Sequence, residues 1–169
     1  SWEWVKSPQT YDLGTGIQTF QIYMREDGAQ IDKIMLTTDS GYTPTGTGPA
    51  ESSSGGEPTA TPTPVPGTFI ESGGQVVMET EHFTAKVNGS GDYITHSWTV
   101  NNVETGASGS EYMETVPDND IVAIASPDAP LLEYDMSFST PGIYYIWIRR
   151  IALGGASDSI FTAFNGGSQ

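Results

Sequence analysis

The sequence predicts an all-β protein, a β-sandwich of about eight or nine short antiparallel strands. The 169 residues include 20 Gly, 11 Pro and 11% aromatic residues, a composition typical of a chain with many tight turns. Apolar and polar residues alternate in several short segments, as in Leu132, Tyr134, Met136 and Phe138, which is the pattern of a strand with one buried face. No window of ten or more residues keeps a helical period, so we expect no long helix.

Turn signals such as Asp27-Gly28 and Pro141-Gly142 separate the expected strands. The segment IYYIWIRRI at 143–151 is apolar on both faces and rich in β-branched and aromatic residues, which predicts a central strand. In chain order, the expected strands lie at 19–24, 31–37, 75–81, 92–100, 111–116, 120–126, 132–138, 143–151 and 159–164.

The charge and cysteine content exclude several classes of function. The chain has 21 acidic residues against 6 Lys and Arg, a formal net charge of −15, which repels nucleic-acid phosphates and anionic lipid headgroups. No apolar run approaches the roughly 20 residues that span a bilayer. The absence of cysteine removes disulfides, thiolate metal sites and cysteine nucleophiles. The chain starts at Ser1 with no Met and no signal peptide, which we interpret as a mature or excised fragment.

Residues 51–67, ESSSGGEPTATPTPVPG, read as a linker because Pro, Ser, Thr and Gly leave almost no apolar side chain to bury. A ligand for a proline-binding domain is the alternative interpretation. The linker divides the chain into segments 1–50 and 68–169. The first segment holds too few strands for a core of its own, so it must pack against the second segment or against another copy of it.

Several motifs resemble carbohydrate-binding modules of families 6 and 35, which are calcium-binding jelly-roll β-sandwiches. The segment QVVMETEHF at 75–83 is similar to the first strand of those modules, which carries two glutamates two residues apart. GSEYMETV at 109–116 and the Pro-Gly-x-Tyr stretch within LLEYDMSFSTPGIYYIWIRR at 131–150 follow the same order. DSIFTAFNGGSQ at 158–169 is similar to the strand that precedes the ligand-binding tryptophan of the family.

The closing part of such a module stands at the front of this chain. SWEWVKSPQTYDLGTGIQTFQIYMREDGAQIDKIMLT at 1–37 resembles the family's paired tryptophans, its Leu-x-x-Gly turn and its last strand. We therefore interpret 1–50 as the C-terminal part and 68–169 as the N-terminal part of one circularly permuted sandwich. A fragment cut across two tandem modules is the alternative origin. The two parts pair within one chain, giving a monomer, or exchange between two chains.

The resemblance implies a structural Ca²⁺ ion. Glu79 and Glu81 lie two apart on an expected strand and project from one face, a spacing that by itself also suits a solvated acidic face. In the family, these two positions and an Asp on the last strand hold calcium through hard oxygen ligands, and the matching residue here is Asp32. Asp118-Asn119-Asp120 has the beginning of a calcium loop, but it lacks the glycine and the closing glutamate and is expected to be a turn.

The resemblance also implies a polysaccharide or oligosaccharide ligand. Trp2 falls where the family places its sugar-stacking tryptophan, Tyr112 where it places the opposing tyrosine, and Gln30 near its hydroxyl-binding asparagine. These three residues would form a cleft at the loop end of the sandwich. Tyr93 and Trp98 in the loop 84–110 are alternative residues for this cleft, and Trp147 is expected in the core. A tryptophan usually packs in a core or at its margin, so a structural role for Trp2 stays open.

A catalytic role has little support in the sequence. His82 and His96 are the two histidines, and no nucleophile elbow, metalloprotease or phosphate-loop motif occurs. A pair of glycosidase carboxylates is easy to find among 21 acids and is therefore uninformative. We predict a non-catalytic carbohydrate-binding module of a secreted modular protein, with a calcium-stabilised structural or adhesive domain as the alternative.

Overall fold

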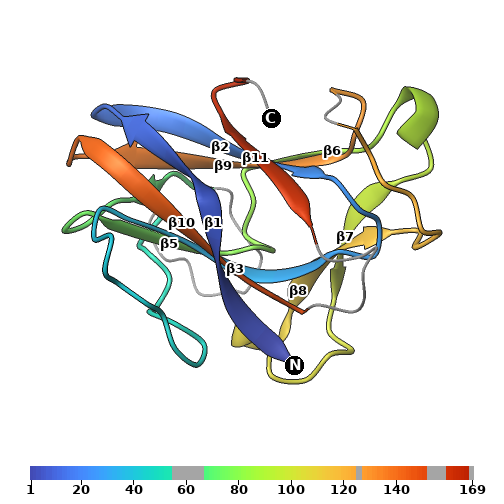
Figure 1. Cartoon of the computed structure of the whole chain (residues 1–169), viewed down its shortest axis with the longest axis horizontal. Coiled ribbons are helices and arrows are strands. Elements are labelled where there is room, and N and C mark those ends of the chain that lie inside the picture. Colours follow the sequence, from blue (N-terminus) through green and yellow to red (C-terminus); the bar gives the residue numbers. More distant parts are fainter. Residues whose placement is uncertain (55–66, 125–126, 152–158, 168–169) are drawn as a thin grey trace.

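The computed structural model describes residues 1–54, 67–124, 127–151 and 159–167. They form two β-sheets packed face to face, which confirms the predicted β-sandwich (Figure 1). Helical structure in these residues is limited to two 3₁₀ turns, η1 (Gly91–Tyr93) and η2 (Ser108–Ser110). None of the described helices is long and apolar enough to cross a membrane.

The first sheet, sheet A, has six strands, and β3 lies at its centre between β10 on one side and β5 and β8 on the other. Its strands are β1 (Trp2–Leu13), β10 (Gly142–Ile151), β3 (Gln30–Thr37), β5 (Gln75–Glu79), β8 (Tyr112–Val116) and β7 (Ser97–Asn101). Sheet B has five strands, and β9 pairs with β2 on one side and with β4 and β6 on the other. Its strands are β11 (Ile160–Phe164), β2 (Gly16–Met24), β9 (Leu131–Phe138), β4 (Phe69–Ile70) and β6 (Ala85–Val87).

The three strands of the first segment find all their partners in the second segment. β1 pairs with β10, β2 with β9 and β11, and β3 with β10, β5 and β8, all antiparallel. Among the described strands, β1, β2 and β3 do not pair with one another. The residues before the linker therefore have no sheet of their own, and their backbone hydrogen bonds depend on the residues that follow it.

The core lies between the sheets and follows the alternation of each strand. Phe20, Ile34, Tyr134, Tyr144 and Ile146 are completely buried there. Ile34 belongs to a strand in which all eight residues are buried, as expected of a central strand in a two-layer domain. Trp147, expected in this core, is 8% exposed but packs in a separate small cluster with Met35 and Val77.

The first strand is longer than the sequence indicates. The Trp-Glu-Trp pattern predicts a short strand, but β1 runs for 12 residues along the edge of sheet A. Its register against β10 shifts between Lys6 and Thr10, and Pro8 lies in this irregular stretch. Proline cannot donate a ladder hydrogen bond and is tolerated at such edge irregularities, so Pro8 interrupts the pairing without ending the strand.

Three of the expected strands are wrong in part. The strand expected at 75–81 ends at Glu79, so Glu81 lies in the turn after β5 and not on the strand with Glu79. Residues 92–96 form a turn with η1, and the strand begins only at Ser97. Residues 120–124 form no strand apart from a single bridge between Val122 and Glu26, and residues 125 and 126 lie outside the described part. The buried Asp27 carboxylate accepts the Asn119 and Ile121 N–H groups at 2.7 and 2.8 Å, which holds this stretch as a loop.

Part of the predicted linker is attached to sheet A. Ser52 donates its backbone N–H to Val77 and accepts the Val77 N–H on its hydroxyl, and a bridge joins Ser54 to Phe69. Residues 51 and 52 therefore run beside β5 of sheet A and residues 53 and 54 beside β4 of sheet B, and the rest of the predicted linker up to residue 66 lies outside the described part.

Glu71, directly after β4, organises the loops next to this stretch. Its carboxylate is 3% exposed and accepts the N–H groups of Gly74, Ser139 and Thr140, together with the hydroxyls of Ser139 and Thr140. Burial by itself would raise the pKa of Glu71, but these hydrogen bonds outweigh burial and lower the pKa to about 2. The ionised carboxylate thus joins the loop before β5 to the β9–β10 turn.

We predict that Glu71→Gln lowers the free energy of unfolding at pH 7 by about 3 kcal/mol, because an amide cannot accept all five donors. The wild-type contribution is present above pH 4.5 and is lost as the pH falls toward 2, so the difference between the two proteins shrinks in acid. Urea unfolding at pH 7 and pH 3 measures both effects. Glu111→Gln, the same change at an exposed position, is the control, and an equal loss in both variants would contradict the prediction.

Candidate functional site

A cluster of buried charged residues lies on the outer face of sheet A, where β3 meets β10. The pairing of these strands is irregular, with Arg149 opposite Lys33 and Arg150 opposite Ile31. Asp32 is the extra residue of this bulge, so its side chain leaves the regular alternation. The bulge brings Asp32 to the same face as Arg149 and Lys33.

Arg149 is the centre of the cluster. Its guanidinium donates to the Asp32 carboxylate, to the Gly106 carbonyl at 3.0 Å and to the Gly46 carbonyl at 3.0 Å. The other Asp32 oxygen accepts the Ser108 N–H at 2.8 Å. Burial raises the pKa of Asp32, and the Arg149 charge acts against this shift. One arginine therefore attaches two loops to the central strand of the sheet.

A second ion pair lies beside the first. Lys33 is 3% exposed, and its ammonium contacts the Glu79 carboxylate at 2.8 Å and the Pro49 carbonyl at 3.1 Å. The same Glu79 oxygen accepts the Ser108 hydroxyl at 2.8 Å. Ser108 thus connects the two ion pairs, because its N–H binds Asp32 and its hydroxyl binds Glu79.

Glu81 is the acid of this cluster that has no ion pair with Arg149 or Lys33. It is 5% exposed, and its Oε2 atom has no hydrogen-bond partner; the same is true of Glu79 Oε2. Burial raises the pKa of Glu81 to about 8, and the nearby Glu79 and Asp32 carboxylates shift it in the same direction. Burial therefore favours the protonated form of Glu81.

The structure brings the three predicted calcium ligands together. The Glu79 carboxylate lies close enough to raise the pKa of Asp32, and both lie close enough to raise the pKa of Glu81, but one oxygen each of Asp32 and Glu79 already binds a cationic side chain. Among the described residues, no group of three or more His, Cys, Asp or Glu side chains is arranged to hold a metal ion. Glu79 Oε2 and Glu81 Oε2 are buried without a hydrogen-bond partner.

Trp2 covers the cluster at its solvent edge. Its ring is partly exposed, lies 5.5 Å from the Arg149 guanidinium and meets the Tyr112 ring edge-on at a centroid separation of 5.2 Å. Tyr112 itself is completely buried. The expectation of two aromatic rings facing each other across an open cleft is therefore corrected: Tyr112 supports the Trp2 ring from below.

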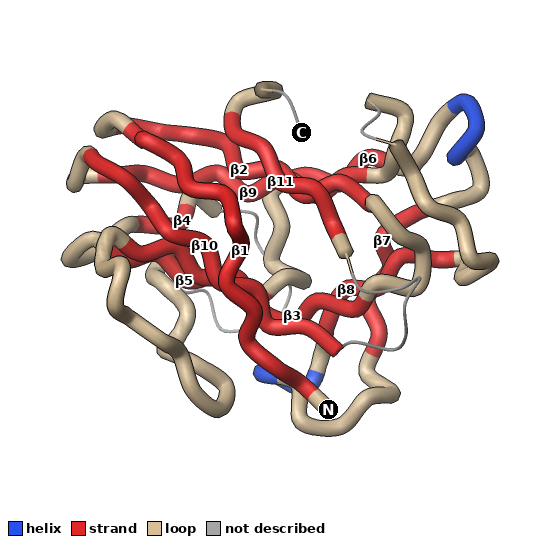
Figure 2. Tube along the Cα trace, in the orientation of Figure 1, coloured by secondary structure: helices blue, strands red, loops and turns tan. Residues whose placement is uncertain are grey.

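Of the other predicted sugar contacts, Trp98 and Tyr93 lie elsewhere, whereas Gln30 lies in the same row of sheet A as Trp2, since both pair with Ile151. Trp98 is fully buried and donates its indole N–H to the Pro130 carbonyl, so it has no ring face to offer a ligand. Gln30 is 6% exposed and donates to Glu114 at 3.1 Å. Tyr93 lies on η1 and packs against Met24, at the opposite end of the molecule from η2 and the N-terminus (Figure 2).

Sequence reasoning missed the basic half of the cluster. The alternation in IYYIWIRRI could have indicated that Trp147 and Arg149 share one face, and IDKI could have indicated that a lysine accompanies Asp32. The glycine-containing loop with Gly46 and Gly48, which Arg149 binds, is also attached to β1, since Trp4 donates its indole N–H to the Gly46 carbonyl. Gly48 in that loop has φ +75°, and a Cβ there would lie 2.5 Å from the Trp4 ring, so glycine is required.

Fold and site together define a β-sandwich domain with a buried ionic cluster that the Trp2 ring covers at its solvent edge. Residues 68–153 match the family described as the glycosyl hydrolase family 115 C-terminal domain. This match covers half of the chain, and the chain belongs to that family. The match supports the predicted association with glycoside hydrolases, and it contains Glu79 and Glu81 but not Asp32. No curated protein and no solved structure matches the chain significantly.

We predict that, in the presence of a chelator, the stability of the protein falls as the pH rises from 4.5 to 8. The folded protein keeps Glu81 protonated in this window while the unfolded chain ionises, so the contribution is complete below pH 4.5 and is lost by about pH 8. Glu81→Gln imitates the protonated acid and should remove this part of the slope, which amounts to at most about 1.4 kcal/mol per pH unit. Urea unfolding from pH 5 to 8 measures it, and parallel profiles for wild type and Glu81→Gln would contradict the assignment.

Proposed function

We propose that the chain is a non-catalytic carbohydrate-binding domain that accompanies a glycoside hydrolase outside the cell. The observation that carries this proposal is the partly exposed Trp2 ring, held in place by Tyr112 on one side and Arg149 on the other. Sugar rings stack on aromatic faces, and a ring fixed by packing loses little conformational entropy on binding. Membership of a family of glycosyl hydrolase C-terminal domains supports the same conclusion.

The environment of the acidic residues favours a role other than catalysis. A glycosidase needs two carboxyl groups on either side of an accessible sugar bond. Asp32, Glu79 and Glu81 are between 0 and 8% exposed, and Ser108 and Arg149 hold the first two within the sheet. The Asp32 and Glu79 carboxylates bind other groups of the protein, and the burial of all three carboxyl groups keeps them from contact with a sugar chain on the surface.

We also propose that residues 68–169 correspond to the first part of the module and residues 1–50 to the last part. The strand pairing supports this order, since β1, β2 and β3 complete sheets that begin after the linker. The family match supports it too, because it begins at residue 68 and leaves the first segment unmatched.

A structural Ca²⁺ ion beside Glu79 and Glu81 is part of this proposal. The ion would supply positive charge to two buried oxygens that have no partner, and it would add to the contacts that Lys33 and Arg149 make between the two segments. Glu79 and Glu81 would be its side-chain ligands, with Asp32 available if Arg149 shares it.

We predict that Trp2→Ala weakens glycan binding by about thirtyfold or more while the melting temperature changes little. A glycan array first identifies the ligand, and calorimetry then gives the affinities. Tyr145→Ala is the matched control, because Tyr145 is another partly exposed aromatic residue of sheet A, under the Lys6 ammonium at 4.5 Å. Equal affinity of Trp2→Ala and wild type would contradict the role of Trp2, and an array without any ligand would favour a purely structural domain.

We predict that Ca²⁺ raises the melting temperature and that Glu81→Gln removes most of this rise. A ligand that binds only the folded state stabilises it by about 2.7 kcal/mol at a hundredfold excess over Kd. Glu81 is the residue to change because Asp32→Ala would also leave Arg149 without its carboxylate. Melting curves in excess Ca²⁺ and in EDTA provide the measurement, with Glu111→Gln as control, and coincident wild-type curves would exclude the calcium site.

A further inference from the structure

The charges around Trp2 bear on the kind of glycan that the proposed site can accept. The ionic cluster beneath the ring is balanced, because Arg149 pairs with Asp32. Lys33 likewise pairs with Glu79 at 2.8 Å. The Arg149 guanidinium lies 5.5 Å from the Trp2 ring, but it also donates to two loop carbonyls, and its side chain is 7% exposed. A ligand on the exposed side of the ring therefore meets no available cation in this cluster.

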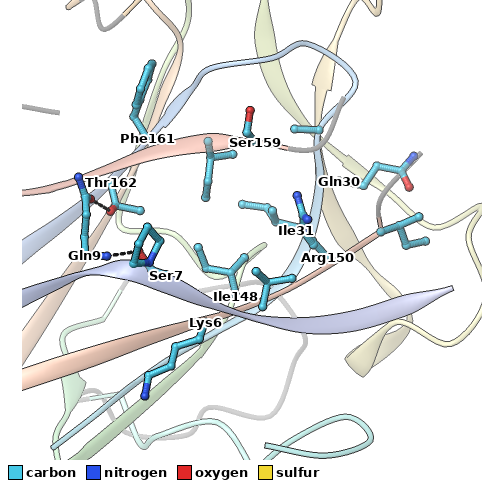
Figure 3. A pocket seen from close by; sticks show the side chains of 15 residues that line it. Lys6, Ser7, Gln9, Gln30, Ile31, Ile148, Arg150, Ser159, Phe161 and Thr162 are labelled. Atoms are coloured by element: carbon cyan, nitrogen blue, oxygen red, sulfur yellow. Dashed lines mark hydrogen bonds between the residues drawn. The ribbon is translucent and has the colours of Figure 1, made fainter. Parts of the chain in front are cut away.

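Arg150 follows Arg149 in the sequence but lies on the opposite face of sheet A. It is opposite Ile31 in the pairing of β10 with β3, and it lines a pocket of about 280 Å³ between the sheets (Figure 3). Its guanidinium lies 3.7 Å from the Glu3 carboxylate. A sugar that stacks on Trp2 contacts the outer face of the sheet and therefore does not meet Arg150.

The remaining cationic side chains are engaged within the protein as well. The chain has six Lys and Arg residues against 21 acidic residues, and all six belong to the described part. Each contacts an acceptor: Lys6 the Ser40 carbonyl, Arg25 the Glu26 carboxylate, Lys33 that of Glu79, Lys86 the Trp98 carbonyl, Arg149 the Asp32 carboxylate and Arg150 that of Glu3. An anionic sugar would have to take a cation from one of these partners, at a cost in lost contacts.

Two acidic residues stand at the margin of the site. Glu104 lies in the loop after β7 and Glu114 lies on β8, and both are partly exposed. Burial raises the pKa of the Tyr112 hydroxyl, and the Glu114 and Glu104 carboxylates raise it further. Both carboxylates therefore lie near the ring that supports Trp2 at a centroid separation of 5.2 Å. Their charge gives a negative potential beside the proposed site.

A carboxylate accepts hydrogen bonds and donates none, so it favours a sugar hydroxyl over a sugar carboxylate. The Glu114 oxygens accept the side-chain amides of Gln30 and Asn101, one at each oxygen. These donors are neutral, and each oxygen can accept a second hydrogen bond. A hydroxyl of an uncharged sugar can donate to it, whereas a uronate or sulfate group presents only acceptors and a like charge.

The expected repulsion is moderate because the margin of the site is open to water. Two unit charges about 8 Å apart change an affinity by about two- to sixfold at effective dielectric constants of about 40 to 80. Two glutamates that act on one sugar carboxylate thus give roughly a tenfold difference at low salt. The difference should shrink at about 1 M salt, where the screening length is about 3 Å.

We propose that the Trp2 site selects uncharged glycans, and that Glu104 and Glu114 determine this selectivity by repelling uronic acids and sulfated sugars. The uncharged sugar stacks on the exposed part of the Trp2 ring and donates hydroxyl hydrogens to the two carboxylates. This inference rests on the proposed glycan-binding function and adds the class of ligand, which the fold and the aromatic ring alone leave open.

The test compares hexasaccharides of glucose, mannose and galactose with the hexasaccharides of the matching uronic acids, each pair having the same linkage. An array of neutral, uronic and sulfated glycans is read in parallel, in buffer without added calcium. We expect the array ligands to be uncharged, and each uronic member to bind about tenfold or more weakly than its neutral partner in calorimetry at pH 7 and low salt. The gap should narrow near 1 M NaCl. A short Gly/Ser extension before Ser1 keeps the terminal amino group away from Trp2.

Glu104→Gln and Glu114→Gln each remove one charge beside the site. Each should raise the affinity for the uronic members several-fold and leave that for the neutral members nearly unchanged, since an amide oxygen still accepts a hydroxyl hydrogen. Asp12→Asn is the matched control, because Asp12 is an exposed acid about 33 Å from Trp2 along β1, beyond the screening length. If Glu114→Gln does not fold, Glu104→Gln and the salt dependence of the wild type still test the selectivity.

Failure of this inference can be told apart from failure of the proposed function. Equal or tighter binding of a uronic or sulfated glycan, lost in Trp2→Ala, would keep the glycan site and overturn its selectivity. An equal effect of Glu104→Gln on both members of a pair would overturn the role of that residue. The absence of any bound glycan, or binding that Trp2→Ala leaves unchanged, would overturn the proposed glycan site and this inference with it.

Discussion

The ion pair between Asp32 and Arg149 is the contact on which most of the outer face of sheet A depends. Asp32 belongs to the first segment and Arg149 to the second, so the pair joins the two parts of the chain within one sheet. The same guanidinium holds the loops that contain Gly46 and Gly106. A buried ion pair is costly to desolvate, and removing one partner alone typically destabilises a protein by about 3–5 kcal/mol. The pair therefore fixes an arrangement more than it adds net stability.

The balance of charge around this pair leaves one buried carboxyl group, that of Glu81, without an ion pair to Arg149 or Lys33. Arg149 compensates Asp32 and Lys33 compensates Glu79, but Glu81 shares the cluster without a cation among these residues. Such a group keeps its proton or receives a metal ion, because an isolated buried charge is too costly. At Glu71 the cost of burying a carboxylate is offset by hydrogen-bond donors, which lower its pKa and keep it ionised. Two buried glutamates thus have opposite pKa shifts: burial and the nearby Glu79 and Asp32 carboxylates raise the pKa of Glu81, whereas the hydrogen-bond donors around Glu71 lower its pKa.

The alternation of side chains along β10 places adjacent residues on opposite faces of sheet A. Arg149 belongs to the ionic cluster and Arg150 to the pocket between the sheets, although they are neighbours in sequence. The Arg149 guanidinium is held by the Asp32 carboxylate together with the loop carbonyls of Gly46 and Gly106.

The sequence by itself determined the fold class, the main strands and the identity of the acidic residues, because alternation, turn residues and charge are local properties. It did not determine the length of β1, the loop at 120–124 or the burial of Tyr112 and Trp98, all of which depend on contacts with distant residues. The acidic half of the cluster was visible as Asp32, Glu79 and Glu81, but the basic half was not recognised. Arg149 meets Asp32 because a bulge displaces Asp32 by one position in the register of β3 against β10, whereas Lys33 meets Glu79 because the two residues lie directly opposite each other in the pairing of β3 with β5. Register between strands more than a hundred residues apart is set by packing of the whole sandwich, so only the tertiary structure could decide which charges meet.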